Sequence, residues 1–133
     1  MADINPMIRH LLLCDDVRPD PDHPEKLNIY GLFSRITSQL TLAYPLRHPE
    51  MCVLLQFANG RGSGEAKIVV RAADTGEVVF TSRAHRLVLP ADPLGILGAT
   101  FRLKDCPLPR AGLYWVEFMW KERELAQEPL ELR

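Results

Sequence analysis

The chain has 133 residues and a mass of 15.1 kDa; 47% of its residues are hydrophobic and 25% are charged. This is the size of one domain and the composition of an ordinary globular protein, so disorder, collagen-like repeats and coiled coils are excluded. The 16 basic and 17 acidic side chains nearly cancel, which removes the electrostatic basis for nucleic-acid binding. We therefore expect residues 1–133 to form a single domain with its own core.

Alternation of apolar and polar residues predicts strands from the start of the chain. The first covers residues 7–14, and the second covers 27–37, where Gly31 interrupts the apolar phase and indicates a β-bulge. A third strand is predicted at 51–58. The glycine-rich stretch 60–64 that follows it is expected to be a flexible link.

The second half of the chain continues this pattern. Strands are predicted at 65–73, 77–81, 84–89, 96–104 and 112–120, with 124–132 as a possible ninth. Tight hairpins are expected at Asp74-Thr75-Gly76 and at Lys121-Glu122-Arg123. The best helical candidate is a single turn within 92–97. In the strand at 112–120, the even positions are expected to face the core: Tyr114, Val116, Phe118 and Trp120.

About eight strands at intervals of roughly 8–12 residues, without a helix of three turns, are typical of an all-β fold. We predict an antiparallel two-sheet sandwich of immunoglobulin-like architecture. The three cysteines Cys14, Cys52 and Cys106 form no CxxC pair, so they are expected to be reduced and buried. No apolar run reaches 18 residues and Leu11–Leu13 is too short for a leader, so we expect a cytoplasmic protein that does not span a membrane.

Several motifs along the chain resemble a family of small uncharacterised bacterial proteins with a domain of unknown function. The motifs are Leu11-Leu12-Leu13-Cys14-Asp15-Asp16-Val17-Arg18, Asp20-Pro21, Pro24-Glu25-Lys26-Leu27-Asn28-Ile29-Tyr30-Gly31, Tyr44-Pro45, Arg47-His48-Pro49, Gly60-Arg61-Gly62-Ser63-Gly64-Glu65, Phe101-Arg102-Leu103-Lys104-Asp105-Cys106-Pro107, Gly112-Leu113-Tyr114-Trp115-Val116 and Ala126-Gln127-Glu128-Pro129-Leu130. The resemblance covers nearly the whole chain. It implies a bacterial origin and a β-rich fold, and it supplies no activity and no catalytic residues.

The most polar stretch is 15–25, whose carboxylates could hold a calcium ion, a cation that prefers oxygen ligands. The candidate ligands are Asp15, Asp16, Asp20, Asp22 and Glu25. The stretch lacks the glycine and distal glutamate of a known calcium loop, so the alternative is a connection whose aspartates cap turns. No other metal or cofactor site is expected.

Catalytic motifs are missing from the sequence. His10, His23, His48 and His85 lack metal-binding spacing, and no GxSxG elbow occurs. The glycines of 60–64 precede a predicted strand, whereas a phosphate-binding loop precedes a helix. We therefore expect no enzymatic activity. A hydrolase would need one of the histidines at 10, 48 or 85 beside a nucleophile.

Some positions opposite the predicted core face are apolar where a solvated sheet would be polar. In the strand at 112–120 these are Leu113, Trp115 and Met119, and similar positions on other strands are Val69, Val79, Cys52 and Leu54. Either these residues form an exposed interface, or the segment 82–96, with Leu87, Leu89, Leu94 and Ile96, folds over them. The outward Lys67, Arg71, Arg102 and Lys104 are expected to pair with Glu77, Glu117 or Glu124.

These observations favour a non-enzymatic interaction module that works by protein–protein contact, as a homo-oligomer or an accessory subunit. Leu113, Trp115, Met119 and Val79 are the candidate interface residues. The alternative is a ligand- or calcium-binding domain that uses the acidic stretch 15–25. A hydrolase is the third hypothesis.

Overall fold

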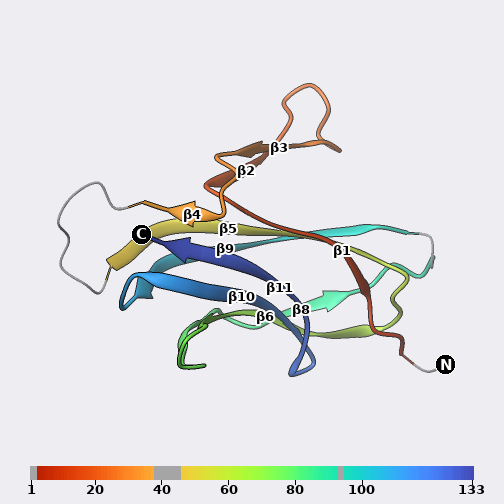
Figure 1. Cartoon of the computed structure of the whole chain (residues 1–133). Coiled ribbons are helices and arrows are strands. Elements are labelled where there is room, and N and C mark those ends of the chain that lie inside the picture. The colour runs from red at the N-terminus through yellow and green to blue at the C-terminus, as the bar shows by residue number, and fades with distance from the viewer. Residues whose placement is uncertain (1–2, 38–45, 93–94) are drawn as a thin grey trace.

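The computed structural model describes residues 3–37, 46–92 and 95–133, which contain eleven strands and no helix (Figure 1). The strands are β1 (Met7–Cys14), β2 (Asp16–Pro19), β3 (Leu27–Tyr30), β4 (Arg35–Ile36), β5 (Leu46–Ala58), β6 (Ser63–Ala72), β7 (Val78–Thr81), β8 (His85–Val88), β9 (Leu97–Leu108), β10 (Gly112–Trp120) and β11 (Arg123–Leu132). The predicted all-β class is confirmed. The predicted turn within 92–97 includes residues 93–94, which lie outside the described ranges.

Two sheets pack face to face and form the sandwich (Figure 1). One sheet has the order β1-β5-β9. The other has the order β4-β11-β10-β6-β7, and β8 pairs with the opposite end of β6. The described strand pairs are antiparallel except for β4 with β11, which is parallel. The predicted immunoglobulin-like two-sheet sandwich is therefore confirmed, with one parallel pair at an edge.

The core lies between the two sheets, because each strand turns alternate side chains toward the other sheet. Tyr114, Val116, Phe118 and Trp120 of β10 are each at most 1% exposed, as the alternation predicted. The ring of Phe118 meets Phe57 of β5 at 5.3 Å and Phe101 of β9 at 6.2 Å between centroids. These aromatic contacts join the two sheets across the middle of the sandwich.

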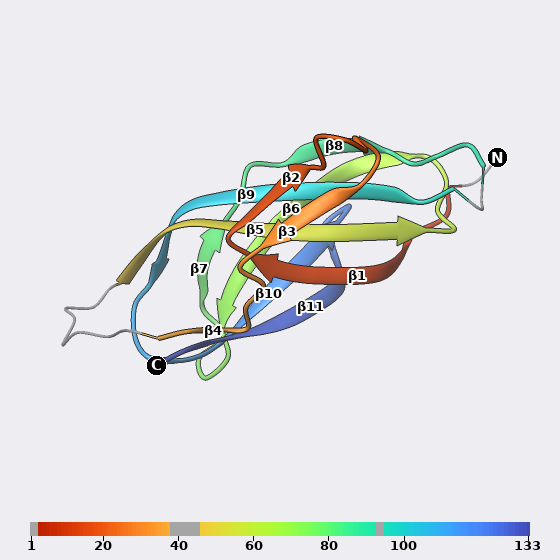
Figure 2. The same ribbon diagram turned by 90° about the horizontal axis from the view of Figure 1, so that it is seen from above.

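A two-stranded ribbon, β2 with β3, lies across the outer face of the three-stranded sheet (Figure 2). Beneath it, Val17 of the ribbon packs on Cys14 and Cys52 in a second, small core, with Leu54 at its side. This ribbon covers the apolar outer positions that the sequence shows at Cys52 and Leu54. The predicted loop at 15–25 thus contains a strand, β2.

The prediction of one strand over 27–37 with a bulge at Gly31 is wrong. The strand ends at Tyr30, Gly31 takes φ +65°, and the chain then leaves the ribbon and joins the other sheet as β4. The positive φ favours glycine at this crossing, and a Cβ there would also displace the Asp15 side chain, whose carboxylate oxygen would lie 2.1 Å away. Alternation alone did not reveal that the two halves belong to different sheets.

The glycine-rich stretch 60–64 is anchored rather than a free link. Ile4 and Arg61 exchange two backbone hydrogen bonds of 3.1 and 3.0 Å, and Gly60 lies against Pro6 and the core residue Leu89. The N-terminal residues thus extend the ordered structure along this connection. The stretch leads into strand β6, as the sequence predicted.

Both predicted hairpins are present, and their turns have positive φ angles. Gly76 has φ +75°, and the second hairpin places Lys121 at +50° and Glu122 at +64°. Two consecutive positive φ angles match the twist of the flanking strands, so β10 and β11 pair along their whole length. Strand β9 runs longer than predicted, through Pro107. It can do so because β9 is an edge strand, where a missing N–H costs no ladder bond.

Tyr114 forms a tyrosine corner at the start of β10. Its hydroxyl donates to the carbonyl oxygen of Arg110 at 2.5 Å and accepts from the Arg110 backbone N–H at 3.1 Å. The Arg110 guanidinium in turn pairs with both carboxylate oxygens of Asp74, at 2.7 and 3.1 Å. A tyrosine that bonds the backbone a few residues upstream is a hallmark of immunoglobulin-like sandwiches.

Candidate interaction surface

The outer face of the six-stranded sheet carries a group of apolar residues from three strands, β7, β10 and β11. We call it the outer patch and define it as Leu113, Trp115, Met119, Val78 and Pro129. Register places Trp115 of β10 between Arg71 of β6 and Pro129 of β11, and Val78 of β7 lies beyond Arg71. Directly opposed residues share a face, so these side chains lie on the same face of the sheet, with Arg71 between Trp115 and Val78.

The outer patch is open to solvent to a degree that is unusual for large apolar side chains. Leu113 is 42% exposed and Val78 is 43% exposed, whereas Trp115 and Met119 are half-buried and Pro129 is exposed. The interface role of Leu113, Trp115 and Met119 stays a prediction, but all three occupy the predicted outward positions of β10. Clustered exposure of this kind marks contact sites.

Val79 does not lie on this face. The register between β6 and β7 shifts between Val70 and Arg71, so Val79 occupies an irregular position and packs against the main core. Its neighbour Val78 takes the outward place opposite Arg71. The prediction that Val79 faces outward is therefore wrong, because an irregularity of one residue exchanges the two faces of a strand.

An ion pair between a buried carboxylate and a partly exposed arginine lies beside the outer patch. Glu117 is 7% exposed, and its carboxylate accepts from Nε of Arg71 at 3.2 and 3.4 Å. Arg71 also donates from Nη1 to the Gly76 carbonyl oxygen at 2.9 Å, which fixes the guanidinium. This pair is one of those that the sequence predicted. Arg71 neutralises the Glu117 carboxylate within the sheet. If a partner covered this face, Glu117 would therefore not become an isolated buried charge.

Several other charged side chains near the outer patch also form ion pairs. Lys67 contacts Glu122 at 3.1 Å, and Glu131 contacts both Arg35 and Arg133. Because opposite charges alternate around the apolar centre, the face carries no strong charge of one sign. It is therefore suited to a neutral partner surface.

The sequence also allowed the alternative that the segment 82–96 folds over this face and covers it. Instead, β8 extends the sheet itself, with Leu87 packed against the main core and Leu89 buried in it. Ile96 is 50% exposed, and Leu94 lies outside the described ranges. The described residues of this segment thus contribute to the sandwich interior, and the prediction that they cover the outer patch is wrong.

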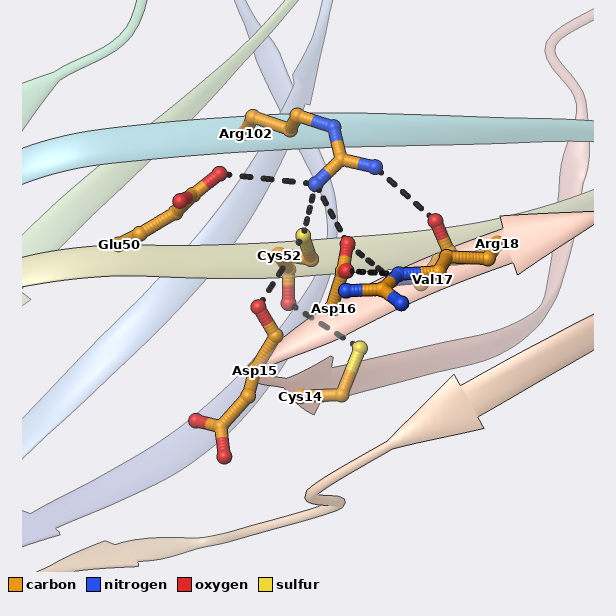
Figure 3. A network of polar contacts seen from close by, with 8 residues as sticks. All are labelled: Cys14, Asp15, Asp16, Val17, Arg18, Glu50, Cys52 and Arg102. Carbon is orange, nitrogen blue, oxygen red and sulfur yellow. Dashed lines mark hydrogen bonds and ion pairs between the residues drawn. The ribbon is translucent and has the colours of Figure 1, made fainter.

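On the opposite side of the molecule, Arg102 connects the ribbon to the sheet (Figure 3). From β9 it donates to an Asp16 carboxylate oxygen at 2.8 Å, to the Val17 carbonyl oxygen at 2.9 Å and to the Cys52 sulfur at 3.2 Å. Asp16 also accepts from Nε of Arg18 at 2.6 Å. This network holds β2 against the outer face of the three-stranded sheet.

The hydrogen bonds from Arg102 and then Arg18 lower the pKa of Asp16 from 3.8 to about 2. A carboxyl with a depressed pKa stabilises the folded state above its ordinary pKa, and this contribution is lost as the pH falls toward 2. We expect the amide of Val17, which donates to Asp16, to titrate by NMR near pH 2. In Arg102→Ala the midpoint is expected to rise toward 3.8.

Lys104→Ala is the matched control, because Lys104 is a basic residue on the same strand and face that makes no contact with Asp16. It is expected to leave the Asp16 titration unchanged. Equal midpoints in the two variants would show that Arg102 does not hold the ribbon through this carboxyl.

The other acidic candidates do not converge on a metal site. The Asp15 carboxylate lies beside Gly31, and Glu25 contacts Nδ1 of His23 at 3.7 Å. Asp16 is already bound to two arginines, and Asp20 and Asp22 are not gathered with these carboxylates into a ligand set. Within residues 3–37, 46–92 and 95–133, no three metal-binding side chains form a group. The described residues therefore give no support to the calcium hypothesis.

The cysteines are buried, as predicted. Removal from water raises the pKa of the Cys14 thiol to about 11 and that of Cys106 to about 12, and it also raises the pKa of Cys52. Nucleophilic reactions require the thiolate, so all three are expected to be inert in the folded protein. An aromatic disulfide reagent should detect no thiol in native protein and three in denaturant. A rapid native reaction would contradict their burial.

The histidines occupy separate elements. His23 contacts Glu25, whereas His85 packs edge-on against Phe101 with 5.6 Å between centroids. His10 lies on β1 at the outer face of the three-stranded sheet, and the side chain of His48 lies outside the described residues. The hydrolase hypothesis, which needs a histidine beside a nucleophile, gains no support from this arrangement.

In the described ranges, no helix is long and apolar enough to cross a membrane. The architecture, the tyrosine corner and the apolar outer face define the class of the protein: an immunoglobulin-like β-sandwich with an open sheet face. More specifically, the chain belongs to a family of unknown function, DUF6941, whose model matches residues 9–133. This confirms the resemblance to a domain of unknown function. A search of curated proteins gives no match.

Solved structures share the fold at low sequence identity. The chain is similar to part of the alkylpurine DNA glycosylase AlkC of Pseudomonas fluorescens, at 13% identity and TM-score 0.51, covering 99% of this chain and 31% of that one. It is also similar to part of a β-glucosidase from Listeria innocua, at 10% identity and TM-score 0.51, covering 96% of this chain and 16% of that one. An immunoglobulin-like protein from Pseudomonas aeruginosa aligns over 100% of both chains at 11% identity and TM-score 0.44.

The chain thus spans less than a third of the length of the two enzymes. These likenesses show the sandwich fold, and the activities of the two enzymes are properties of much longer chains. Function must therefore be argued from the surfaces of this protein.

Proposed function

We propose that the protein is a non-enzymatic interaction module that associates with a second copy of itself through the outer patch. The observation that carries the proposal is the open apolar face of the six-stranded sheet, with Leu113 and Val78 more than two-fifths exposed. Burying apolar surface is the main driving force of protein association.

A second copy fits this face better than a strongly charged partner does. In a two-fold contact the same surface meets itself, so a face with charge of one sign would repel its copy. The ion pairs of Glu117 with Arg71 and of Lys67 with Glu122 neutralise this face internally. Trp115 and Leu113 then supply apolar anchors of the kind that dominate interface energies.

An accessory subunit that binds a different protein through the same outer patch is the second candidate. The same exposed side chains favour it, and it differs in predicting that the isolated chain is a monomer. The oligomeric state at increasing concentration therefore separates the two candidates.

Light scattering behind size exclusion tests the proposal over a range of concentrations. The mass is expected to rise from 15.1 kDa toward about twice that value as the concentration increases. Leu113→Arg introduces a charge within the contact and is expected to keep the chain monomeric.

Leu32→Arg is the matched control, because Leu32 is 64% exposed and lies in the link after the ribbon, away from the outer patch. It is expected to associate like the native chain. A constant mass of 15.1 kDa would reject self-association, and equal effects of the two substitutions would place the contact elsewhere.

A further inference from the structure

A groove opens between the ribbon and the outer face of the three-stranded sheet. The ribbon itself lies on the opposite side of the sandwich from the six-stranded sheet, which carries the outer patch (Figures 1 and 2). The groove has a volume of about 340 Å³, within the range of small-molecule sites. Its lining residues are His10, Leu12, Glu25, Leu27, Ile29, Leu54, Leu55, Gln56 and Gly98. The proposed self-association does not use this groove.

The groove exists because only one strand of the ribbon rests closely on the sheet. Val17 of β2 is 5% exposed, since it packs on Cys14 and Cys52. On β3, Ile29 is paired with Val17 and shares its face, yet Ile29 is 40% exposed and Leu27 is 47% exposed. The apolar underside of β3 is therefore open to solvent.

Two apolar walls border the groove. Leu27 and Ile29 form the wall on the ribbon, and Leu12 and Leu54 form the wall on the sheet. An apolar chain placed between them would remove both walls from water at once. Gly98 of β9 adds no side chain here, and a Cβ at this position would meet only the Leu55 carbonyl oxygen, at 3.8 Å.

The polar groups of the groove favour a positively charged end group. The Glu25 carboxylate, which lies 3.7 Å from Nδ1 of His23, only accepts hydrogen bonds when ionised. Gln56 offers a carbonyl oxygen, and His10 offers the nitrogens of its ring. Glu25 belongs to the turn of the ribbon that carries Asp20 and Asp22 and one lysine, Lys26, so acidic side chains outnumber basic ones there. A carboxylate ligand would be repelled at this position.

We propose that the groove binds a small amphipathic cation, with its apolar chain between the leucine and isoleucine walls and its ammonium group beside Glu25. This site is distinct from the outer patch and would function in a monomer as well as in an oligomer. It assigns a role to the exposed apolar residues of β3 and to part of the acidic stretch.

The probes for the test are butylammonium, hexylammonium and octylammonium, with octanoate as the anionic counterpart, followed by NMR titration of the complete chain. Affinity is expected to rise about fourfold for each added methylene, because each one buries further apolar surface. The amides of Leu12, Leu27 and Gly98 are expected to shift. Octanoate binding as tightly as octylammonium, or shifts located elsewhere, would overturn the proposal.

Two substitutions examine the two halves of the site separately. Glu25→Gln removes the charge and is expected to weaken octylammonium about tenfold while leaving 1-octanol binding unchanged. Gly98→Phe fills the groove and is expected to abolish binding of both, with Gly98→Ala as the control that adds only a methyl group. Octylammonium affinities unchanged by both Glu25→Gln and Gly98→Phe would contradict the site.

The test is independent of self-association. Leu113→Arg, which is expected to prevent dimer formation, should bind octylammonium as the native chain does. A thermal unfolding midpoint equal to that of Gly98→Ala would show that Gly98→Phe is folded. Should it not fold, the Glu25→Gln arm still decides whether the charge is recognised.

Discussion

Replacing Trp115 with alanine is expected to weaken self-association at least 30-fold while leaving the chain folded. Trp115 lies at the centre of the outer patch, flanked by Pro129 and Arg71, and a two-fold contact would contain it twice. Central aromatic residues of an interface each contribute about 2 kcal/mol or more, which corresponds to roughly 30-fold in affinity. Analytical ultracentrifugation over a concentration series measures the change.

Two controls define what this result means. Trp115→Phe keeps most of the apolar surface and is expected to retain much of the association. Leu32→Ala, at an exposed apolar residue elsewhere, should have no effect on association. Circular dichroism reports folding in each variant. If Trp115→Ala abolishes folding instead, Trp115 is a core residue and the outer patch is not a contact surface.

Tyr114→Phe is expected to destabilise the fold by about 2 kcal/mol, which lowers Tm by roughly 5–10 °C. The phenylalanine fills the same space in the core, where Tyr114 is 1% exposed, so packing is retained. What is lost is the hydroxyl that satisfies both the N–H and the carbonyl oxygen of Arg110. Unpaired, partly buried backbone groups account for the cost.

Tyr30→Phe is the matched control, because it removes the same hydroxyl from a ring that is 46% exposed and lies under Arg18. It is expected to change stability by less than about 0.5 kcal/mol. Differential scanning calorimetry of both variants provides the comparison. Equal Tm values for the two variants would mean that the tyrosine corner does not stabilise the sandwich.

The sandwich itself could be predicted from the sequence because alternation reports burial directly. In β10 the even residues carry the core face, and they are buried as the pattern requires. The turns at Gly76 and at Lys121-Glu122 were likewise predictable from their position between two alternating runs. These features depend on residues that are close in the sequence.

The features that the sequence did not reveal depend on distant partners or on small irregularities. Arg102 and Asp16 are 86 positions apart, so nothing in either motif indicates that they meet. The chain changes sheets at Gly31 within an apolar run, and one irregular residue in β7 exchanges Val78 and Val79. Alternation describes the faces of a strand, and it carries no information on which strands are neighbours.

The candidate surfaces likewise combine features that follow from nearby residues with features that depend on distant parts of the chain. The outward positions of Leu113, Trp115 and Met119 followed from the period of β10, whereas the addition of Pro129 and Val78 required the strand order. The groove could not be predicted, because it arises where β3 crosses a sheet whose strands come from other parts of the chain. The sequence places Leu27 and Ile29 in the strand predicted over 27–37, but alternation does not indicate whether the face that they share is covered.

Acrylamide quenching of tryptophan fluorescence, measured over a protein dilution series, tests whether the chain associates through the outer patch. The chain has two tryptophans, and Trp120 is 1% exposed, so the quenchable signal reports Trp115 at the outer patch. Self-association through this patch predicts that quenching falls as concentration and mass rise together. Quenching that stays constant while the mass doubles would place the contact on another surface and contradict association through the outer patch.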